Sequence, residues 1–527
     1  MNFTIKRITL FFLLISFSTI AFAGINPAYY NIKDNGAVGD GKTLDTDAIN
    51  ATILKAEAGG GGTVYFPPGV YLSASIRLKS NITLYLEAGS TIEAVHDSIA
   101  QYDLPEPNEA GANYQDYGHS HWKNSLIWGI GLENVSIIGP GLIHGKGLNP
   151  GFNRFADESK GENRYKDGGP GSGNKAIALR DCRNVILRDF SILHGGHFGI
   201  LATGVDNMTI DNLKIDTNRD GMDIDACNNV RVTNCSVNSP WDDGICLKAS
   251  YGLGKVRHCE NITISDCFLA GNFVEGTLLD ATFKKPGPEY KSYKTGRIKF
   301  GTESNGDFKN ITITNCVFDD SRGIAIESVD GSHIEDVAIS NITMRHVANS
   351  PIFIRLGSRL RGPDNPKVGS IKRISINNIV VSDASGAYAT SFSAIPGHYI
   401  EDIRISNIRF NQQGGGKKED NNIFPTENEK NYPEPGMFGA LPAYGFFFRH
   451  VKGLEMSHVK LDYNLAEGRS AFVLDDVHDA YFDHMNIKQG IDNAPFFDLR
   501  NVSDFLIDIS RNIEDTKQKE KVKRKKI

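Results

Sequence analysis

A short strand-like motif recurs along most of the chain and constrains its fold more than any other feature. In most copies a polar residue precedes an alternating apolar stretch that often ends in Asn or Asp. Most copies are 22 to 32 residues apart, which is the signature of stacked structural repeats. Because no helical segments separate them, we expect an all-β chain folded as a right-handed parallel β-helix, with neighbouring strands about 4.8 Å apart. The twelve copies begin at residues 134, 184, 207, 229, 261, 310, 336, 373, 402, 453, 479 and 504.

The two ends of the chain differ from this repeat. In residues 1–23, basic residues precede an apolar run that ends in Ala-Phe-Ala, which predicts a cleaved signal peptide and an exported protein, periplasmic or secreted. Residues 24–510 are expected to form a single β-helix domain. Residues 511–527 are strongly basic without apolar periodicity, and predict a disordered tail. No stretch after the signal is apolar enough to cross a membrane.

A short helix is predicted before the first repeats. It runs from Asp45, a suitable N-cap, to Ala58, with Ile49, Ile53 and Leu54 on one face and a glycine run after it. Such a helix would cover the first, otherwise unpaired coil of the solenoid.

Charge and cysteine content argue against nucleic-acid binding and against a disulfide framework. The formal net charge is −6, which gives no indication of nucleic-acid binding. Six of the seven cysteines fall into two columns of the repeat, where stacked side chains point the same way. This geometry is poor for disulfides and favours buried thiols. We expect no metal, no cofactor and a monomer.

Three aspartates in two similar segments are the candidate catalytic groups. Asp220-Gly-Met-Asp-Ile and Asp243-Gly-Ile-Cys-Leu align at an offset of 23 residues, so that Asp220 and Asp243 would share a column on successive coils. Asp242 stands beside them. Carboxylates held this close perturb each other's pKa and suit acid–base work on a glycosidic bond. Solvated aspartates at coil corners remain the alternative.

Four segments interrupt the repeat and are candidates for the walls of a groove, because long loops on a rigid solenoid usually carry function. Ordinary solvated loops are the alternative. The segments are 97–125, 149–174, 277–298 and 412–445.

Over nearly the whole chain after the signal, these motifs resemble glycoside hydrolase family 28, the polygalacturonases and rhamnogalacturonan hydrolases. Asn218-Arg-Asp-Gly-Met-Asp is similar to the family's Asn-Thr-Asp-Gly-x-Asp, and Trp241-Asp-Asp-Gly to its Asp-Asp motif. The resemblance implies that Asp242 is the general acid and that Asp220 and Asp243 activate the water, with inversion at the anomeric carbon. Glu303 matches a glutamate of some bacterial relatives and is a candidate substrate contact. Further candidates are Asn218, His197, Lys248 and Glu327, with a structural role as the alternative for His197.

Two motifs of this family are missing at the positions where the resemblance predicts them. The Gly-His-Gly position falls in Ala270–Gly276, which has no histidine, and the Arg-x-Lys position carries Ala325 and Glu327. Because Glu327 would repel a uronate, we expect a rhamnose on the leaving side, and hence cleavage of the GalA-α-1,2-Rha bond of rhamnogalacturonan I. If a lysine such as Lys284, Lys285 or Lys299 replaces the missing cations, the chain would instead be a polygalacturonase, exo or endo. A polysaccharide lyase and a non-catalytic glycan-binding β-helix are further alternatives.

Overall fold

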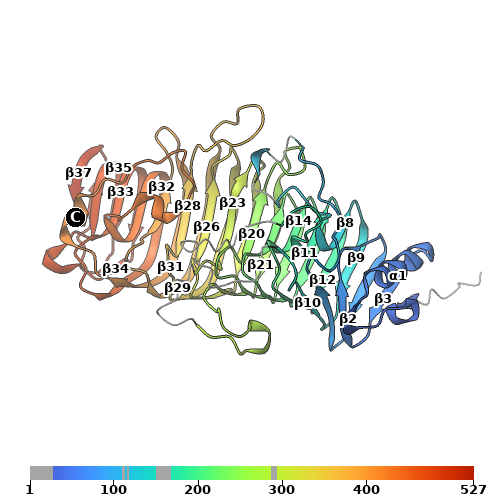
Figure 1. Ribbon diagram of the computed structural model, residues 1–527. Helices are drawn as coiled ribbons and strands as arrows, with labels where there is room; N and C mark the ends of the chain where they lie inside the picture. The colour runs from blue at the N-terminus through green and yellow to red at the C-terminus, as the bar shows by residue number, and fades with distance from the viewer. Residues whose placement is uncertain (1–27, 110–112, 116–117, 150–167, 286–293) are drawn as a thin grey trace, which may run out of the picture.

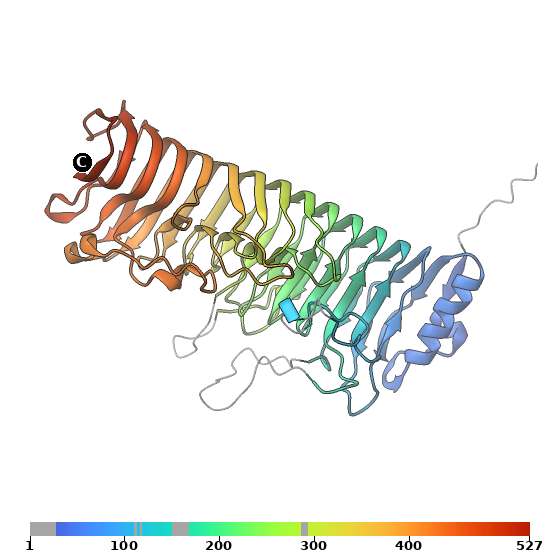
Figure 2. The same cartoon turned by 90° about the horizontal axis from the view of Figure 1, so that it is seen from above.

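The computed structural model describes residues 28–109, 113–115, 118–149, 168–285 and 294–527, and its strands wind into one long parallel β-helix (Figure 1). The predicted signal peptide lies outside these residues. The fold is the right-handed parallel β-helix expected from the repeat. Figure 2 shows the coils stacked along a single axis, with the helical N-terminal cap at one end and the C-terminus at the other.

Each coil contributes to three parallel sheets, and the sequence repeats form the first, called here the repeat sheet. All twelve copies begin inside its strands, in the predicted register. Its strands are β1 (Tyr29–Asn31), β3 (Gly62–Phe66), β6 (Ile82–Leu86), β9 (Glu133–Ile138), β12 (Arg183–Arg188), β15 (Asp206–Asp211), β18 (Asn228–Thr233), β21 (Cys259–Ser265), β24 (Phe308–Thr314), β27 (His333–Arg345), β29 (Ser370–Ala384), β31 (Ile400–Gly414), β32 (Ala443–Leu465), β33 (Ser470–Asp483) and β35 (Phe497–Asp508).

The second sheet, called here the short sheet, turns the chain toward the third. Its strands are β2 (Asp40–Leu44), β4 (Gly69–Ser73), β7 (Ser90–Ala94), β10 (Leu142–His144), β13 (Ser191–Leu193), β16 (Lys214–Asp216), β19 (Ser236–Asn238), β22 (Phe268–Ala270), β25 (Val317–Asp319) and, near the end of the chain, β34 (Asn486–Ile487).

The third sheet carries the candidate aspartates and is called here the site sheet. In the last coils it is continued by the first halves of β32, β33 and β35. Its other strands are β5 (Ile76–Arg77), β8 (Ser125–Ile130), β11 (Lys175–Arg180), β14 (Phe198–Thr203), β17 (Asp220–Asp225), β20 (Ile245–Ala249), β23 (Ile298–Ser304), β26 (Ile324–Ser328), β28 (Ile352–Leu356) and β30 (Thr390–Ser393).

The polar residue that opens many repeats makes the turn between the site sheet and the repeat sheet. Asn134, Asn184 and Asn207 have φ of 54–58°, a left-handed conformation that Asn tolerates better than most residues. The amide of Asn184 donates to Oδ1 of Asn134 at 2.9 Å, and that of Asn207 to Asn184 at 2.8 Å. The repeat therefore encodes the turn as well as the strand, while Ile, Val and Leu side chains stack inside.

The N-terminal cap is the predicted helix, α1 (Thr46–Ala58), and Asp45 is its N-cap residue. The carboxylate of Asp45 accepts from the amides of Val38 at 2.7 Å and Gly39 at 3.1 Å instead of capping the helix directly. Ile49 and Ile53 are buried as expected, but Leu54 is 52% exposed, so its predicted place on the buried face was wrong. A helix turns by 100° per residue, and the step from Ile53 to Leu54 leaves the buried stripe.

The predicted disorder of residues 511–527 is contradicted. Residues in this stretch form β36 (Thr516–Gln518) and β37 (Val522–Lys526), both antiparallel to β35. They cover the backbone edge that the last coil would otherwise expose. Arg524 pairs with the buried Asp498 at 2.8 Å, so the basic composition serves a specific contact.

The seven cysteines are all buried and unbridged, as the column argument predicts. None of the helices in the described ranges has the length and apolar character needed to cross a bilayer.

Candidate functional site

The three aspartates meet on the site sheet. Asp220 is the first residue of β17, and Asp242 and Asp243 lie in the turn before β20. Met222 pairs with Ile245 and Ile224 with Leu247, which confirms the predicted offset of 23 residues. One carboxylate oxygen of each aspartate lies within 4.8 Å of the others. Asp220 and Asp243 are buried, whereas the side chain of Asp242 is 27% exposed and is the most accessible of the three.

Three cations surround this trio. Arg219 donates to Asp242 at 3.1 Å, Arg297 donates to Asp243 at 2.6 Å, and the ammonium of Lys299 lies 3.4 Å from Asp243. Arg297 and Lys299 flank Ile298, the first residue of β23, so they come from the coil that follows the trio. Both side chains are buried. The site thus combines clustered carboxylates with cations in a dry setting, where charge interactions are strong.

These surroundings drive the pKa values of two aspartates apart. Burial disfavours the charge of Asp243, but Arg297 and Lys299 outweigh it and lower the pKa of Asp243 to about 2. Burial and the charge of Asp242 raise the pKa of Asp220 well above its ordinary value. The pKa values of these two neighbouring carboxyls are therefore shifted in opposite directions, a separation that acid–base catalysis can use.

Glu327 also lies in this region, on β26. Its carboxylate is fully buried and lies 3.7 Å from the ammonium of Lys299. Burial raises the pKa of Glu327 to about 7, although Lys299 and Arg297 oppose the shift. Arg297 and Lys299 of the preceding coil place positive charge near Glu327, which agrees with the alternative that Lys299 replaces the missing cations.

The position expected for Gly-His-Gly also needs correction. Ala270 ends β22, and the chain then leaves the coil before returning at β23. The amide of Gly244 donates to the carbonyl of Arg297 at 2.9 Å. Gly296 and Arg297, and not Ala270–Gly276, therefore occupy the coil position next to Asp243 and Gly244.

A second buried charge cluster lies farther along the same strands. Lys248 pairs with Glu303 at 3.0 Å and with Asp223 at 3.3 Å, and Arg361 donates to Glu303 at 2.8 Å. Burial would lower the pKa of Lys248 and raise that of Glu303, but their partners reverse both shifts strongly. Lys248 and Glu303, predicted as substrate contacts, are engaged with protein groups here.

The two remaining predicted contacts flank the trio. Asn218 is buried two residues before Asp220, and its carbonyl accepts from the amide of Trp241 at 3.1 Å. His197 is buried at the start of β14, against Phe198 with ring centroids 4.5 Å apart. Burial lowers the pKa of His197 well below its ordinary value, which favours the neutral imidazole.

Among the described residues, three groups have the geometry to hold a metal ion. They are the trio itself, Asp319 with Asp320 and His346, and His458 with Asp483 and His484. In the trio, the paired cations and the raised pKa of Asp220 compete with a metal.

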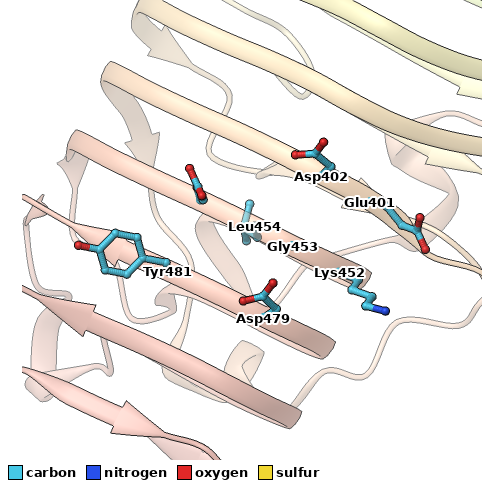
Figure 3. A pocket seen from close by; sticks show the side chains of 8 residues that line it. Glu401, Asp402, Lys452, Gly453, Leu454, Asp479 and Tyr481 are labelled. Atoms are coloured by element: carbon cyan, nitrogen blue, oxygen red, sulfur yellow. The ribbon is translucent and has the colours of Figure 1, made fainter.

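A separate hollow of about 360 Å³ lies on the repeat sheet, away from the trio. Figure 3 shows Asp402, Asp479, Lys452 and Tyr481 around it, with Gly453 between the two aspartates. None of the predicted site residues contributes to its lining.

Comparisons with known proteins indicate which family the chain resembles. Residues 29–246 match the family model described as "Rhamnogalacturonase A/epimerase, pectate lyase-like". Over 407 residues the chain is 24% identical to a probable polygalacturonase of Vitis vinifera, covering 74% of this chain and 75% of the relative. These matches support a polygalacturonase-like glycoside hydrolase of family 28. It is a glycosidase.

Solved structures agree on the fold of the chain. The family 28 exopolygalacturonase of Yersinia enterocolitica superposes with a TM-score of 0.53 at 18% identity, covering 94% of this chain and 79% of that one. A hyperthermoactive exopolygalacturonase from Thermotoga maritima gives 0.52 at 19% identity, covering 74% and 87%.

Sequence reasoning missed several residues of this candidate site. Arg219 and Arg297 were not singled out, and Lys299 was named only as a lysine that a loop would supply. A signal was present, because Arg297-Ile298-Lys299 is itself an Arg-x-Lys string, one coil earlier than the position searched. Tyr432 and Glu434 also reach the site, across more than 130 residues of sequence. Separations of that size leave no local signal.

Proposed function

We propose that this glycosidase hydrolyses galacturonosyl bonds of pectic polysaccharide, with homogalacturonan as the favoured substrate. The observation that carries the proposal is the pairing of the aspartate trio with Arg297 and Lys299. The trio supplies the groups for hydrolysis. The two buried cations supply positive charge beside it, where a galacturonate carboxylate needs a partner.

In this proposal Asp243 is the base that activates water, because its lowered pKa of about 2 favours the ionised carboxylate. Asp242 presents the proton to the leaving oxygen, since it is the accessible member of the trio. The raised pKa of Asp220 favours its neutral form, which limits the repulsion between the three carboxyls. Attack by water gives inversion at the anomeric carbon.

Glu327 is compatible with a galacturonate in this arrangement. With a pKa of about 7 it is mostly neutral in mildly acidic solution, where it does not repel a uronate. Lys299, which is paired with Asp243 at 3.4 Å, still contributes positive charge beside the trio. The expected order of substrates is therefore the reverse of the one that the sequence favours: oligogalacturonides before rhamnogalacturonan I.

Cleavage of the GalA-α-1,2-Rha bond remains the second candidate. Ala325 and Glu327 still replace the cations of β26, and the matching family model carries a rhamnogalacturonase description. A rhamnose on the leaving side needs no cation at that strand.

The test compares initial rates on oligogalacturonides and on rhamnogalacturonan I oligosaccharides of equal length, with the Asp242→Asn protein as the inactive control. Faster cleavage of the oligogalacturonides supports homogalacturonan, and the opposite order supports the second candidate. Product absorbance in the ultraviolet would reveal a lyase, which alone makes an unsaturated sugar. Proton NMR of the first product should show the β-anomer. Binding without any cleavage would leave a non-catalytic glycan-binding protein.

Export is part of the proposal, because pectic polymers lie outside cells. The signal-type segment 1–23 supports it, and N-terminal sequencing of the mature protein tests it.

A further inference from the structure

One long segment runs along the site sheet on the C-terminal side of the trio. It comprises residues 421–442, between β31 and β32, and is called here the wall segment. As the residue number rises, the coil that it contacts moves back along the solenoid toward the trio. In Figure 2 it belongs to the orange loops that lie alongside the coils.

The wall segment is held first by a column of buried arginines. Arg355, Arg449 and Arg500 share this column through the pairings of β28, β30, β32, β33 and β35. Each donates to carbonyl oxygens of the wall segment. Arg500 bonds those of residues 421 and 423 at 2.9 and 2.8 Å, Arg449 that of residue 425 at 2.8 Å, and Arg355 that of residue 427 at 2.7 Å.

These bonds make the wall segment a fixed part of the structure. The three arginines are at most 2% exposed, and lifting the segment would take away these partners. A buried charge that loses its partners is costly, so detachment is strongly disfavoured.

An apolar contact fixes the return of the wall segment. Phe438 and Leu441 pack on the outer face of the site sheet, against Ala325 on β26, Phe353 on β28 and Ala389. The part of the sheet beyond β23 is therefore covered by the protein's own chain. A polysaccharide cannot lie on it.

The far end of the wall segment reaches the trio's cations. The carboxylate of Glu434 accepts two bonds from Arg297, at 2.5 and 3.2 Å, and Lys299 donates to the hydroxyl of Tyr432 at 3.1 Å. Arg297 in turn holds Asp243 at 2.6 Å. No further coil separates the wall from the groups that would perform the chemistry.

We propose that the wall segment ends the substrate groove at the catalytic coil, so that this enzyme binds the terminus of a pectic chain and acts from that end. The inference rests on the proposed function, and it adds the mode of attack. Cleavage within a chain requires room for sugars on both sides of the bond. On the β26 side the wall segment leaves no face of the sheet for a continuing chain, so Tyr432 and Glu434 would meet its terminal sugar.

The experiment uses the full protein and oligogalacturonides in three forms: unmodified, with the reducing-end sugar reduced to the alditol, and with a 4,5-unsaturated sugar at the non-reducing end. We expect one short product of constant size from the first time point with the unmodified form. One of the two end modifications should stop its release. Products of many sizes from all three forms would overturn the inference while leaving the proposed function intact. If no pectic oligosaccharide is cleaved, including those of rhamnogalacturonan I, both fall.

A pair of variants links the end preference to the wall segment. The Phe438→Ala/Leu441→Ala protein loses the apolar anchor and should gain cleavage inside the chain, seen as mixed product sizes. Lys430→Ala, which truncates an exposed side chain of the same segment, is the control and should keep the single product. If the anchor variant keeps the wild-type products although proteolysis shows residues 421–442 loosened, the assignment of end recognition to this segment is wrong. If the anchor variant releases a single product and proteolysis shows residues 421–442 unchanged, Phe438 and Leu441 do not anchor the wall segment.

Discussion

Two regions of the site sheet bury charged side chains in similar settings but satisfy them differently. In the C-terminal coils, Arg355, Arg449 and Arg500 bond backbone carbonyls of the wall segment. In the catalytic coils, Asp220, Asp242 and Asp243 crowd one another, and the available cations hold Asp243 more firmly than the other two. Arginines whose partners are fixed carbonyls and carboxylates stabilise a shape, whereas crowded carboxyls keep unequal proton affinities that chemistry can use.

The largest effect expected from this comparison follows removal of the accessible acid. Asp242→Asn should lower kcat by roughly 10³-fold or more, because an amide cannot deliver the proton that the leaving oxygen needs. The melting temperature should stay near that of the wild type, since Asp242 is partly exposed. Turnover close to wild type in the folded variant would contradict the proposed mechanism.

Asp220→Asn separates the two candidate proton donors. If Asp242 is the acid, this variant retains the alkaline limb of its pH–rate profile, although kcat falls. Disappearance of that limb would instead make Asp220 the donor, in line with its raised pKa.

Substitutions in the arginine column of the C-terminal coils should lower the stability of the protein. Arg500→Met leaves the buried Asp498 with Arg524 as its remaining partner and removes the bonds to the carbonyls of residues 421 and 423, of which the first keeps a bond from Arg524 at 3.2 Å. The free energy of unfolding should therefore fall by about 3 kcal/mol. Thermal unfolding measures this. The matched control is Arg524→Met, a partly exposed partner of the same carboxylate, for which we expect about 1 kcal/mol or less. Equal effects would contradict the structural role of the arginine column.

Arg297→Gln tests the catalytic coils in the same way. Without the guanidinium the pKa of Asp243 should rise from about 2, so the base takes up a proton at a higher pH. The acidic limb of the pH–rate profile should therefore move upward, with a loss of about 10²-fold in kcat/KM.

Its control is Arg322→Gln, which removes another cation paired with Glu434, at 3.5 Å. That variant should keep the wild-type acidic limb. A profile that shifts equally in both variants would mean that Arg297 acts through the general charge of the site and not through Asp243.

The sequence predicts the fold well because the repeat carries both strand and turn. Asn134, Asn184 and Asn207 mark left-handed turns whose spacing sets the coil, and the aspartate trio follows from that register. The same reasoning fails where a long loop interrupts the coil. After the loop between Ala270 and Arg297, the cations Arg297 and Lys299 lie one coil before the position that the family motif predicts, which holds Ala325 and Glu327.

Contacts between distant segments have no periodic signature. Glu434 lies 137 residues from Arg297, and nothing local to either residue announces the pair. The basic C-terminal residues illustrate the same limit, because composition predicts disorder while an unpaired edge of β35 recruits them as strands.

The smallest expected effect concerns metal ions. The trio's oxygens lie close enough to hold a cation, but a metal needs deprotonated carboxylates with lone pairs to share. Here the raised pKa of Asp220 favours its protonated form, while Arg219 and Arg297 bond the other two aspartates. Dialysis against EDTA should therefore leave kcat/KM unchanged, and added Ca²⁺ should not increase it. Loss of activity in EDTA that Ca²⁺ restores would mean that a metal can outcompete these cations, and the division of roles within the trio would have to be drawn again around that ion.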